Sequence, residues 1–302
     1  MKIASERPLA RSIIKTAFQL FGGDHSHAHN WFPGLSIVGA PGAPDRLICY
    51  RGKRIAALQG SGALTASAGS DICIVGSGPS VRGIDLTSLE PRQAILLNGA
   101  IGLAGEGVEP LAIAVEDERF VWRHHQLMRE NVRGDGLCLF SVGVLRALCE
   151  VDAAWVANRR VILIDDLRKP YGARKRSFAE AAALPFAYTD GSAAGLSTEP
   201  DLGVFQGGSV AVSAVQFAIH CRPCRIGLVG IDISNANLPR FYETDGHMAR
   251  SGIARAEERI LAHFALAKRY CDEKGISAVC HSPVSALLKC GYPYDARFSR
   301  HQ

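Results

Sequence analysis

Residues 71–98 read DICIVGSGPSVRGIDLTSLEPRQAILLN, and this stretch decides the fold. The apolar run from Ile72 to Val75 predicts a buried strand, which the following glycines end abruptly. A second apolar run, residues 94–97, predicts a parallel neighbouring strand that ends at Asn98. In open α/β sheets ligands bind beyond the carboxyl ends of the strands, where glycines let backbone N–H groups approach phosphate oxygens. The stretch therefore predicts an α/β fold with a nucleotide site at this edge.

The loop after the first strand, Gly76-Ser77-Gly78-Pro79-Ser80, is the candidate phosphate cradle. Its spacing differs from the G-x-G-x-x-G of dinucleotide folds, and the chain has no G-x-x-x-x-G-K-[ST] motif. Pro79 also removes one N–H that a cradle could use. Two interpretations stay open, a phosphate site and a plain strand-to-helix turn. Asn98 favours the site, because its side chain offers both a donor and an acceptor to a base or sugar.

Composition bounds the class of protein. The chain has 302 residues, of which 47% are hydrophobic and 21% charged, and this predicts one globular α/β domain with an N-terminal appendage. The formal net charge of +5 suits an anionic ligand or anionic lipid, and no lysine-rich arm indicates nucleic acid. Nine scattered cysteines fit a reducing compartment. With no signal-like start and no apolar run near ~20 residues, we expect a cytoplasmic protein, either free or peripheral on the inner face of the cytoplasmic membrane.

Residues 1–70 are interpreted as an accessory region before the α/β domain of residues 71–302. Leu9, Ile13, Ala17 and Leu20 recur at helical spacing within residues 8–21. This amphipathic helix either packs on the domain or forms a basic foot on a membrane surface, and the pattern does not separate the two. Residues 47–58 predict a hairpin with Arg51-Gly52-Lys53 at its turn, and residues 60–70 a linker.

Three histidines follow the amphipathic helix at alternate positions, His25, His27 and His29. Alternate side chains of an extended segment share one side and could grip a metal ion. The Gly, Ser, Asn and Pro residues around them favour a mobile loop instead.

A third predicted strand, residues 110–115, ends in Glu116-Asp117-Glu118. Carboxylates at a strand's carboxyl end could hold a divalent ion, but acidic residues also favour the N-terminus of a following helix. We favour the helix terminus and keep Asp117 as a residue at the edge of the site. Further strands are predicted at residues 137–142 and 161–164, with a short helix from Ser141 to Cys149. The basic run 168–176, RKPYGARKR, is a solvated loop or a lid over an anion, and residues 181–203 read as a long loop.

The second informative block is residues 205–232, FQGGSVAVSAVQFAIHCRPCRIGLVGID. Gly207-Gly208-Ser209 precedes an apolar helix and predicts an N-cap with free N–H groups, a second anion cradle. The strand after it closes on Gly230 and Asp232. Cys221 and Cys224 have C-x-x-C spacing without a second pair, which favours structural thiols. A long helix over residues 249–274, a strand over residues 276–280 and a closing helix opened by His281-Ser282-Pro283 complete the chain.

Taken in order, these blocks resemble the bacterial CMP-sialic acid-dependent sialyltransferases over about residues 71–290. In that family G-x-G-P-S follows the first strand, Asn ends the second, a glycine turn opens a buried helix before strand-G-I-D, and Pro-x-Ser follows the last strand. The blocks also resemble hydroxymethylpterin diphosphokinase-like proteins, including flagellin nonulosonate transferases, and CMP-Kdo is a close chemical cousin of the donor. This sequence departs from the family in having Ile233 and Ser234 after Asp232, where aromatic residues are usual, and in the acidic Glu116-Asp117.

The resemblance implies a single-domain GT-A-like variant of the Rossmann-like fold, with a mostly parallel sheet and helices on both faces. It implies an inverting, metal-independent transfer of a sialic acid- or Kdo-type sugar from its CMP ester to a glycan or lipopolysaccharide-type acceptor. His247 is the expected base, since imidazole titrates near working pH, and Tyr242 the expected phosphate-facing phenol. The expected donor-binding residues are Gly76, Ser77, Gly78, Pro79, Ser80, Asn98, Asp117, Gly207, Gly208, Ser209, Gly230 and Asp232.

Two other functions stay open. One is an ATP-dependent diphosphokinase of the hydroxymethylpterin type, for which Glu116-Asp117-Glu118 would hold Mg²⁺. The other is a nucleotide-binding protein that keeps the fold without the chemistry, an alternative that the missing aromatic residues after Asp232 sustain. No metal or other cofactor is expected for the transferase.

Overall fold

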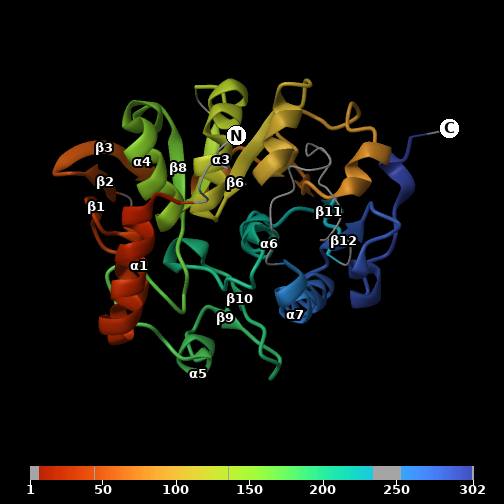
Figure 1. Cartoon of the computed structure of the whole chain (residues 1–302). Helices are drawn as coiled ribbons and strands as arrows, with labels where there is room; N and C mark the ends of the chain where they lie inside the picture. The colour runs from red at the N-terminus through yellow and green to blue at the C-terminus, as the bar shows by residue number, and fades with distance from the viewer. Residues whose placement is uncertain (1–6, 44, 135, 234–252, 301–302) are drawn as a thin grey trace.

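The computed structural model describes residues 7–43, 45–134, 136–233 and 253–300. Its centre is a ten-stranded sheet in the order β1-β2-β3-β8-β7-β6-β5-β4-β11-β12, with helices packed on both faces (Figure 1). The strands of this sheet are β1 (Leu35–Val38), β2 (Leu47–Tyr50), β3 (Lys53–Gln59), β4 (Asp71–Val75), β5 (Ala94–Leu97), β6 (Pro110–Val115), β7 (Leu137–Ser141), β8 (Arg160–Ile164), β11 (Arg225–Val229) and β12 (Ser277–Cys280). The predicted α/β fold with a mostly parallel sheet is confirmed.

The strand that opens the fold-deciding stretch, β4, lies inside the sheet. It pairs in parallel with β5 on one side and with β11 on the other, so that Val75 is opposite both Leu96 and Val229. The chain runs outward from β4 through β5, β6, β7 and β8 in one direction and through β11 and β12 in the other. The order therefore reverses between β4 and β11, and all these strands end at one edge of the sheet.

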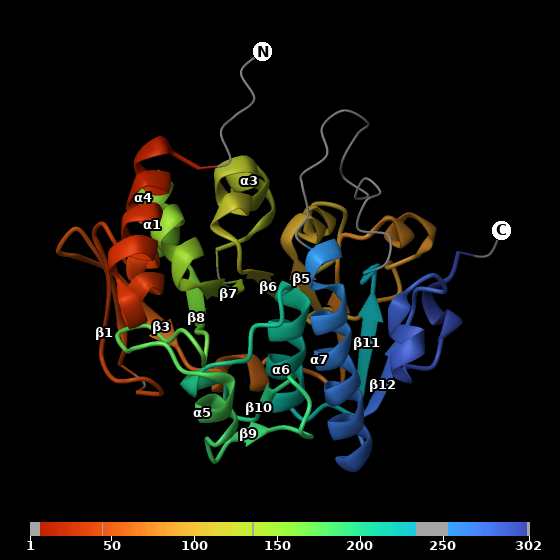
Figure 2. The same ribbon diagram turned by 60° about the horizontal axis from the view of Figure 1, so that its bottom comes forward.

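Helices cover the two faces of the sheet in separate layers (Figures 1 and 2). α3 (Glu118–Asn131) and α4 (Val142–Ala157) pack over one face, and α6 (Val210–His220) and α7 (Ile253–Glu273) over the other. Every residue of α6 from Val210 to Ile219 is buried, as expected of a helix that is apolar all round. The remaining helical elements are α1 (Leu9–Phe21), η1 (Gly23–Asn30), α2 (Gly62–Thr65), η2 (Pro79–Gly83), η3 (Asn98–Ala104), α5 (Phe178–Ala182), η4 (Pro200–Leu202), η5 (Ala286–Cys290) and η6 (Ala296–Phe298).

The strands of residues 1–70 extend the same sheet. β2 and β3 form the predicted hairpin, and β3 pairs in parallel with β8 through Leu58 and Gln59. β1 adds an antiparallel edge strand beside β2. Residues 1–70 thus contribute β1, β2 and β3 to the ten-stranded sheet, and β3 is hydrogen-bonded to β8 of the α/β domain.

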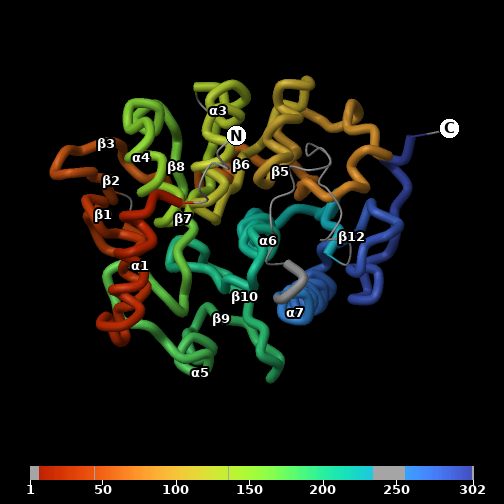
Figure 3. Tube along the Cα trace, in the orientation of Figure 1, coloured from red at the N-terminus to blue at the C-terminus, as the bar shows by residue number. Residues whose placement is uncertain are grey.

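Several elements differ from the sequence predictions (Figure 3). The predicted closing helix after His281-Ser282-Pro283 is wrong: a short 3-10 turn, η5, ends at Gly291, whose φ of 88° is left-handed. α4 extends past Cys149 to Ala157 through a kink at Asp152, where φ is −157° and ψ is 77°, and the segment after the kink buries Trp155 and Val156. The long loop of residues 181–203 holds a two-stranded sheet, β9 (Ala187–Tyr188) and β10 (Leu196–Ser197).

Candidate functional site

A cavity of about 560 Å³ opens where β5, β6, β7 and β8 end. Each strand delivers a polar side chain to its wall, because the carboxyl ends of parallel strands meet at one edge. These residues are Asn98 after β5, Glu116 and Asp117 after β6, Ser141 at the end of β7, and Asp165 and Asp166 after β8. α1, η1 and the N-terminus of α6 complete the wall.

Asn98 lines this cavity and has a buried side-chain acceptor without a partner. Its backbone is left-handed, with φ of 49°, which only a minority of non-glycine residues adopt. Its side-chain Oδ1 is buried and has no hydrogen-bond partner. A buried acceptor without a partner costs about 1–3 kcal/mol, and strained backbone clusters at ligand sites. Both features indicate that Asn98 is arranged for a ligand.

Glu116 is a carboxyl of the cavity wall whose pKa is raised. Burial raises its pKa to about 7, and the hydrogen bond from Ser213 only partly offsets that rise. Ser213 Oγ donates to Glu116 Oε2 at 2.6 Å, and Ser141 Oγ donates to the Glu116 backbone carbonyl at 2.6 Å. These bonds fix both the side chain and the strand end. A carboxyl of this pKa can accept or release a proton near neutral pH.

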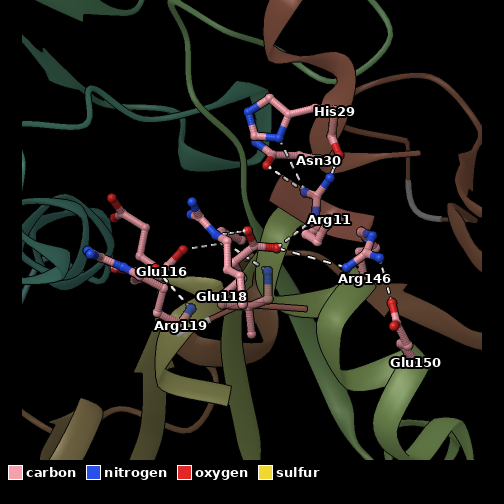
Figure 4. Close-up of polar contacts among 12 residues, drawn as sticks. Arg11, His29, Asn30, Glu116, Glu118, Arg119, Arg146 and Glu150 are labelled. Carbon is pink, nitrogen blue, oxygen red and sulfur yellow. Dashed lines mark hydrogen bonds and ion pairs between the residues drawn. The ribbon is translucent and has the colours of Figure 1, made fainter. Parts of the chain in front are cut away.

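The neighbouring acidic residues serve the fold. Asp117 caps α3 by accepting from the Arg119 N–H at 2.9 Å, and it also holds the Arg119 Nε at 2.7 Å. Glu118 is buried beneath the cavity, with Arg11 Nε at 3.1 Å and Arg146 Nη1 at 3.9 Å (Figure 4). The interpretation of this acidic run as a helix terminus is therefore confirmed for Asp117.

Two further acids line the cavity at the end of β8. Burial raises the pKa of Asp165 to about 6, although the N–H groups of Asp166 and Tyr171 donate to it. Burial also raises the pKa of Asp166. No set of three His, Cys, Asp or Glu side chains in the described part of the chain is arranged to hold a metal ion.

The three histidines lie in η1, a 3-10 helix, and not in an extended segment, and the rings of His25 and His27 stack with their centroids 6.3 Å apart. His27 and His29 line the cavity. Burial, with the charge of Arg11 next, lowers the pKa of His29 to about 3, so this ring stays neutral at ordinary pH. His29 therefore offers hydrogen bonds and no charge.

Cationic side chains surround the acids. Lys15 of α1, Lys169 and Lys175 of the basic run, and Arg119 and Arg123 of α3 all line the cavity. The basic run is held in place by η1, since the Lys175 N–H donates to Asp24 O at 2.9 Å and its Nζ contacts Ser26. The run thus supplies two of the cavity's lysines, in agreement with the anion-binding alternative for this segment.

The glycine turn before α6 joins the cavity. Gly208 and Ser209 line it, with φ of 99° at Gly208, and Ser209 caps α6 by accepting from the Ala211 N–H at 3.3 Å. Arg259 of α7 fixes the turn by donating to Gly207 O at 2.8 Å. The left-handed φ of Gly208 favours a glycine, and a Cβ there would also lie 2.9 Å from Ala256 Cβ.

The first glycine loop lies elsewhere, at the junction of β4 and β11. The N–H groups of Gly76 and Gly78 donate to Val229 O at 2.7 Å and Gly230 O at 2.9 Å. Asp232 accepts from the Ser80 N–H at 2.7 Å and from the Ser80 and Ser282 hydroxyls at 2.8 Å each. None of the residues from Gly76 to Ser80 lines the cavity. Gly76, Gly78, Pro79, Ser80, Gly230 and Asp232 therefore join the two halves of the sheet through their own backbone and side chains.

The sequence-predicted site residues thus fall into two groups. Asn98, Asp117, Gly208 and Ser209 meet in the cavity, and the glycine loop with Asp232 forms the β4–β11 junction. Tyr242 and His247 lie outside the described residues. Sequence reasoning did not select Glu116 as a reactive group, and it missed the acids after β8. The position of Glu116 directly after a buried strand was the available indication.

No family model and no curated protein matches the chain. Among solved structures, the chain is similar to the sialyltransferase CstII from Campylobacter jejuni in complex with the substrate analogue CMP-3FNeuAc. The sequence identity is 13% and the TM-score 0.40, and the match covers 78% of this chain and 90% of that chain. A mutant of the alpha-2,3/8-sialyltransferase CstII matches at 14% identity and a TM-score of 0.38, over 77% of this chain and 90% of that chain. At such low similarity, activity has to be argued from the residues of this chain.

Proposed function

We propose that the protein is a glycosyltransferase that moves a sialic acid- or Kdo-type sugar from its CMP ester to a glycan or lipopolysaccharide-type acceptor, with inversion and without a metal ion. The observation that carries the proposal is the cavity itself. It combines an unpaired acceptor at Asn98, a carboxyl of pKa about 7 at Glu116, and a cationic rim.

The parts fit the groups of such a donor. The amino group of a cytosine is a donor that can satisfy Asn98 Oδ1. The phosphate and the sugar carboxylate are anions that the lysines at the rim and the N–H groups at the start of α6 can bind. Charge that develops on the leaving phosphate can be stabilised by the same cations, the task that a divalent ion performs in other transferases.

Glu116 is the proposed base in this site. Transfer needs a group that takes the proton of the acceptor hydroxyl as the new glycosidic bond forms and CMP leaves. Glu116 stands in the cavity wall, is fixed by Ser213, and is half ionised near pH 7. The sequence analysis assigned this role to His247, so the two residues are alternatives that paired variants separate.

Ligand-dependent melting tests the donor class. Purified protein is heated with CMP, CTP, ATP or AMP, each with and without Mg²⁺. We expect stabilisation by CMP without Mg²⁺, on the order of 2.7 kcal/mol at ~100 times the dissociation constant. Stabilisation by ATP with Mg²⁺ and none by CMP would overturn the proposal in favour of the diphosphokinase. Slow release of CMP from CMP-sialic acid or CMP-Kdo would separate an enzyme from a binding protein.

A further inference from the structure

α1 exposes the apolar side that an amphipathic helix normally buries. Leu9, Ile13, Leu20 and Phe21 are 81%, 69%, 71% and 86% exposed. Leu9, Ile13 and Leu20 follow the spacing of one helix face, so their side chains form a continuous stripe. We call Leu9, Ile13 and Leu20 the α1 stripe, and Phe21, the residue after it, is also exposed. Large apolar side chains gathered on one exposed face indicate an interaction site.

A buried charged residue, together with the half-buried Ile14 and Phe18, attaches α1 to the fold. Arg11 is 1% exposed and donates to Glu118 at 3.1 Å, to Phe32 O at 3.2 Å and to Asn30 Oδ1 at 3.3 Å. Figure 4 shows its guanidinium between Glu118 and Asn30. Because this contact fixes the rotation of the helix, the α1 stripe is held outward by the fold. The alternative in which Ile13, Ile14 and Phe18 cover the flank of the sheet is wrong for Ile13, which is exposed. Ile14 and Phe18 are half-buried, and the Phe18 ring centroid lies 6.0 Å from that of Phe32.

Positive charge lies beside the α1 stripe. The basic run 168–176 packs on η1, directly after α1, through Lys175 and through Pro170 O, which lies 3.0 Å from His27 Nε2. Arg168 and Lys169 of this run are exposed, and Arg174 is exposed in an ion pair with Glu180. A two-fold dimer through this face would bring two copies of the basic run into one interface, which like charges disfavour. Exposed apolar side chains next to exposed cations are the combination that binds an anionic lipid surface.

We propose that the α1 stripe docks on an anionic membrane surface and that the basic run binds its lipid headgroups. None of the helices in the described ranges is long and apolar enough to cross a bilayer. α1 would therefore lie in the plane of the interface.

Docking would also bring the cavity to the membrane. Lys15 and Gln19 of α1 line the cavity from one side, and Lys169 and Lys175 of the basic run from another. A hydroxyl close to the membrane surface would then reach the mouth of the cavity. This geometry assigns a lipid-linked saccharide as the acceptor, an inference that rests on the proposed function.

Vesicle flotation tests the docking independently of activity. The full chain is mixed with vesicles of phosphatidylcholine alone or with roughly 30% phosphatidylglycerol. We expect flotation with the anionic vesicles only. The Ile13→Ser/Leu20→Ser variant should bind at least ~10-fold more weakly. Its matched control is Val151→Ser/Val284→Ser, which changes valines that are 42% and 55% exposed on other elements and should bind like the parent.

The electrostatic part has its own pair of variants. Arg168→Glu/Arg174→Glu should lose at least about fivefold in affinity for each arginine, because the attraction of each cation is lost and a repelled carboxylate replaces it. Arg92→Glu/Arg133→Glu makes the same change in net charge at the opposite edge of the sheet and should leave binding unchanged. CMP binding by all four variants should equal that of the parent, so loss of flotation with intact CMP binding concerns docking alone.

Two results would overturn docking. One is the absence of flotation by the parent. The other is a parent dimer in light scattering that Ile13→Ser/Leu20→Ser converts to monomer, which would assign the α1 stripe to a second copy of the chain. If the parent floats with anionic vesicles but does not bind CMP, the proposed function is wrong and the assignment of the α1 stripe to a membrane surface is retained.

Discussion

The β4–β11 junction and the cavity lie at the same edge of the sheet but differ in whether their polar groups have partners within the protein. At the β4–β11 junction, the N–H groups of Gly76, Gly78 and Ser80 all reach protein acceptors. In the cavity, Asn98 Oδ1 has no partner and Glu116 is held with a raised pKa. Folding alone favours the first arrangement and penalises the second. Glycines after a strand therefore do not by themselves indicate a ligand site, because their N–H groups can find acceptors within the protein.

The largest expected effect is on the rate of transfer. Glu116→Gln keeps the shape and the hydrogen bond from Ser213 but removes the base, so we expect kcat to fall by ~10²–10⁴-fold. In the parent the rate should rise with pH through about 7, because Glu116 must be ionised to act. CMP affinity, measured by calorimetry, should stay unchanged. His247→Ala is the paired variant: if it abolishes transfer while Glu116→Gln does not, the base is His247.

Glu116→Gln should lower the rate of transfer but raise the unfolding free energy. The folded pKa of Glu116, about 7, lies above the ordinary 4.5, so the stability it contributes is full below pH 4.5 and is lost as pH rises through about 7. Glu116→Gln removes this loss. The variant should therefore gain up to about 3 kcal/mol in unfolding free energy relative to the parent at pH 8, and much less at pH 4.5. Equal differences at both pH values, in urea titrations, would refute the raised pKa.

A substitution at the junction should cost stability. A Cβ on Gly78 would lie 2.5 Å from Asp232 Oδ2 and 2.7 Å from Gly230 O, so Gly78→Ala should lower the unfolding free energy by about 2 kcal/mol. Gly83→Ala is the control, because a Cβ there meets no atom within 4 Å. CMP affinity of folded Gly78→Ala should match the parent. A selective loss of CMP binding with little loss of stability would restore the loop as a phosphate cradle.

The smallest effect in free energy is expected at Asn98. Asn98→Gly allows the left-handed backbone but removes the side chain, so CMP affinity should fall about tenfold while stability changes by less than about 1 kcal/mol. Arg92→Gly, at another non-glycine residue with positive φ (60°), is the matched control and should bind CMP like the parent. Equal CMP affinity of both variants would exclude Asn98 from the site.

Much of the fold could be predicted from the sequence because its strands are short, apolar and bounded by turn residues. The bounds of β5 and β6 match the prediction, and Asn98 stands where the parallel sheet places it. The rotation of α1 could not be predicted, because the sequence does not reveal that Arg11 has a buried partner in Glu118, 107 residues away.

The site could be predicted only in part for a similar reason. Motif spacing located Asn98 and the Gly207-Gly208-Ser209 turn, since each follows or precedes a recognisable element. The pKa of Glu116 is raised by burial and lowered in part by the hydrogen bond from Ser213, 97 residues away, and both effects exist only in the folded chain. Likewise, Asp232 and the Ser80 N–H are 152 residues apart, so the sequence does not show that the glycine loop already has its acceptors.

A crystal structure with CMP bound tests the central claim most directly, because it places the nucleotide in one of the two regions compared here. The account predicts CMP in the cavity, with its base or ribose within hydrogen-bond distance of the Asn98 side chain and its phosphate near Ser209 and the rim lysines. CMP bound at the β4–β11 junction, on the N–H groups of the glycine loop and without contact to Asn98 or Ser209, would contradict it.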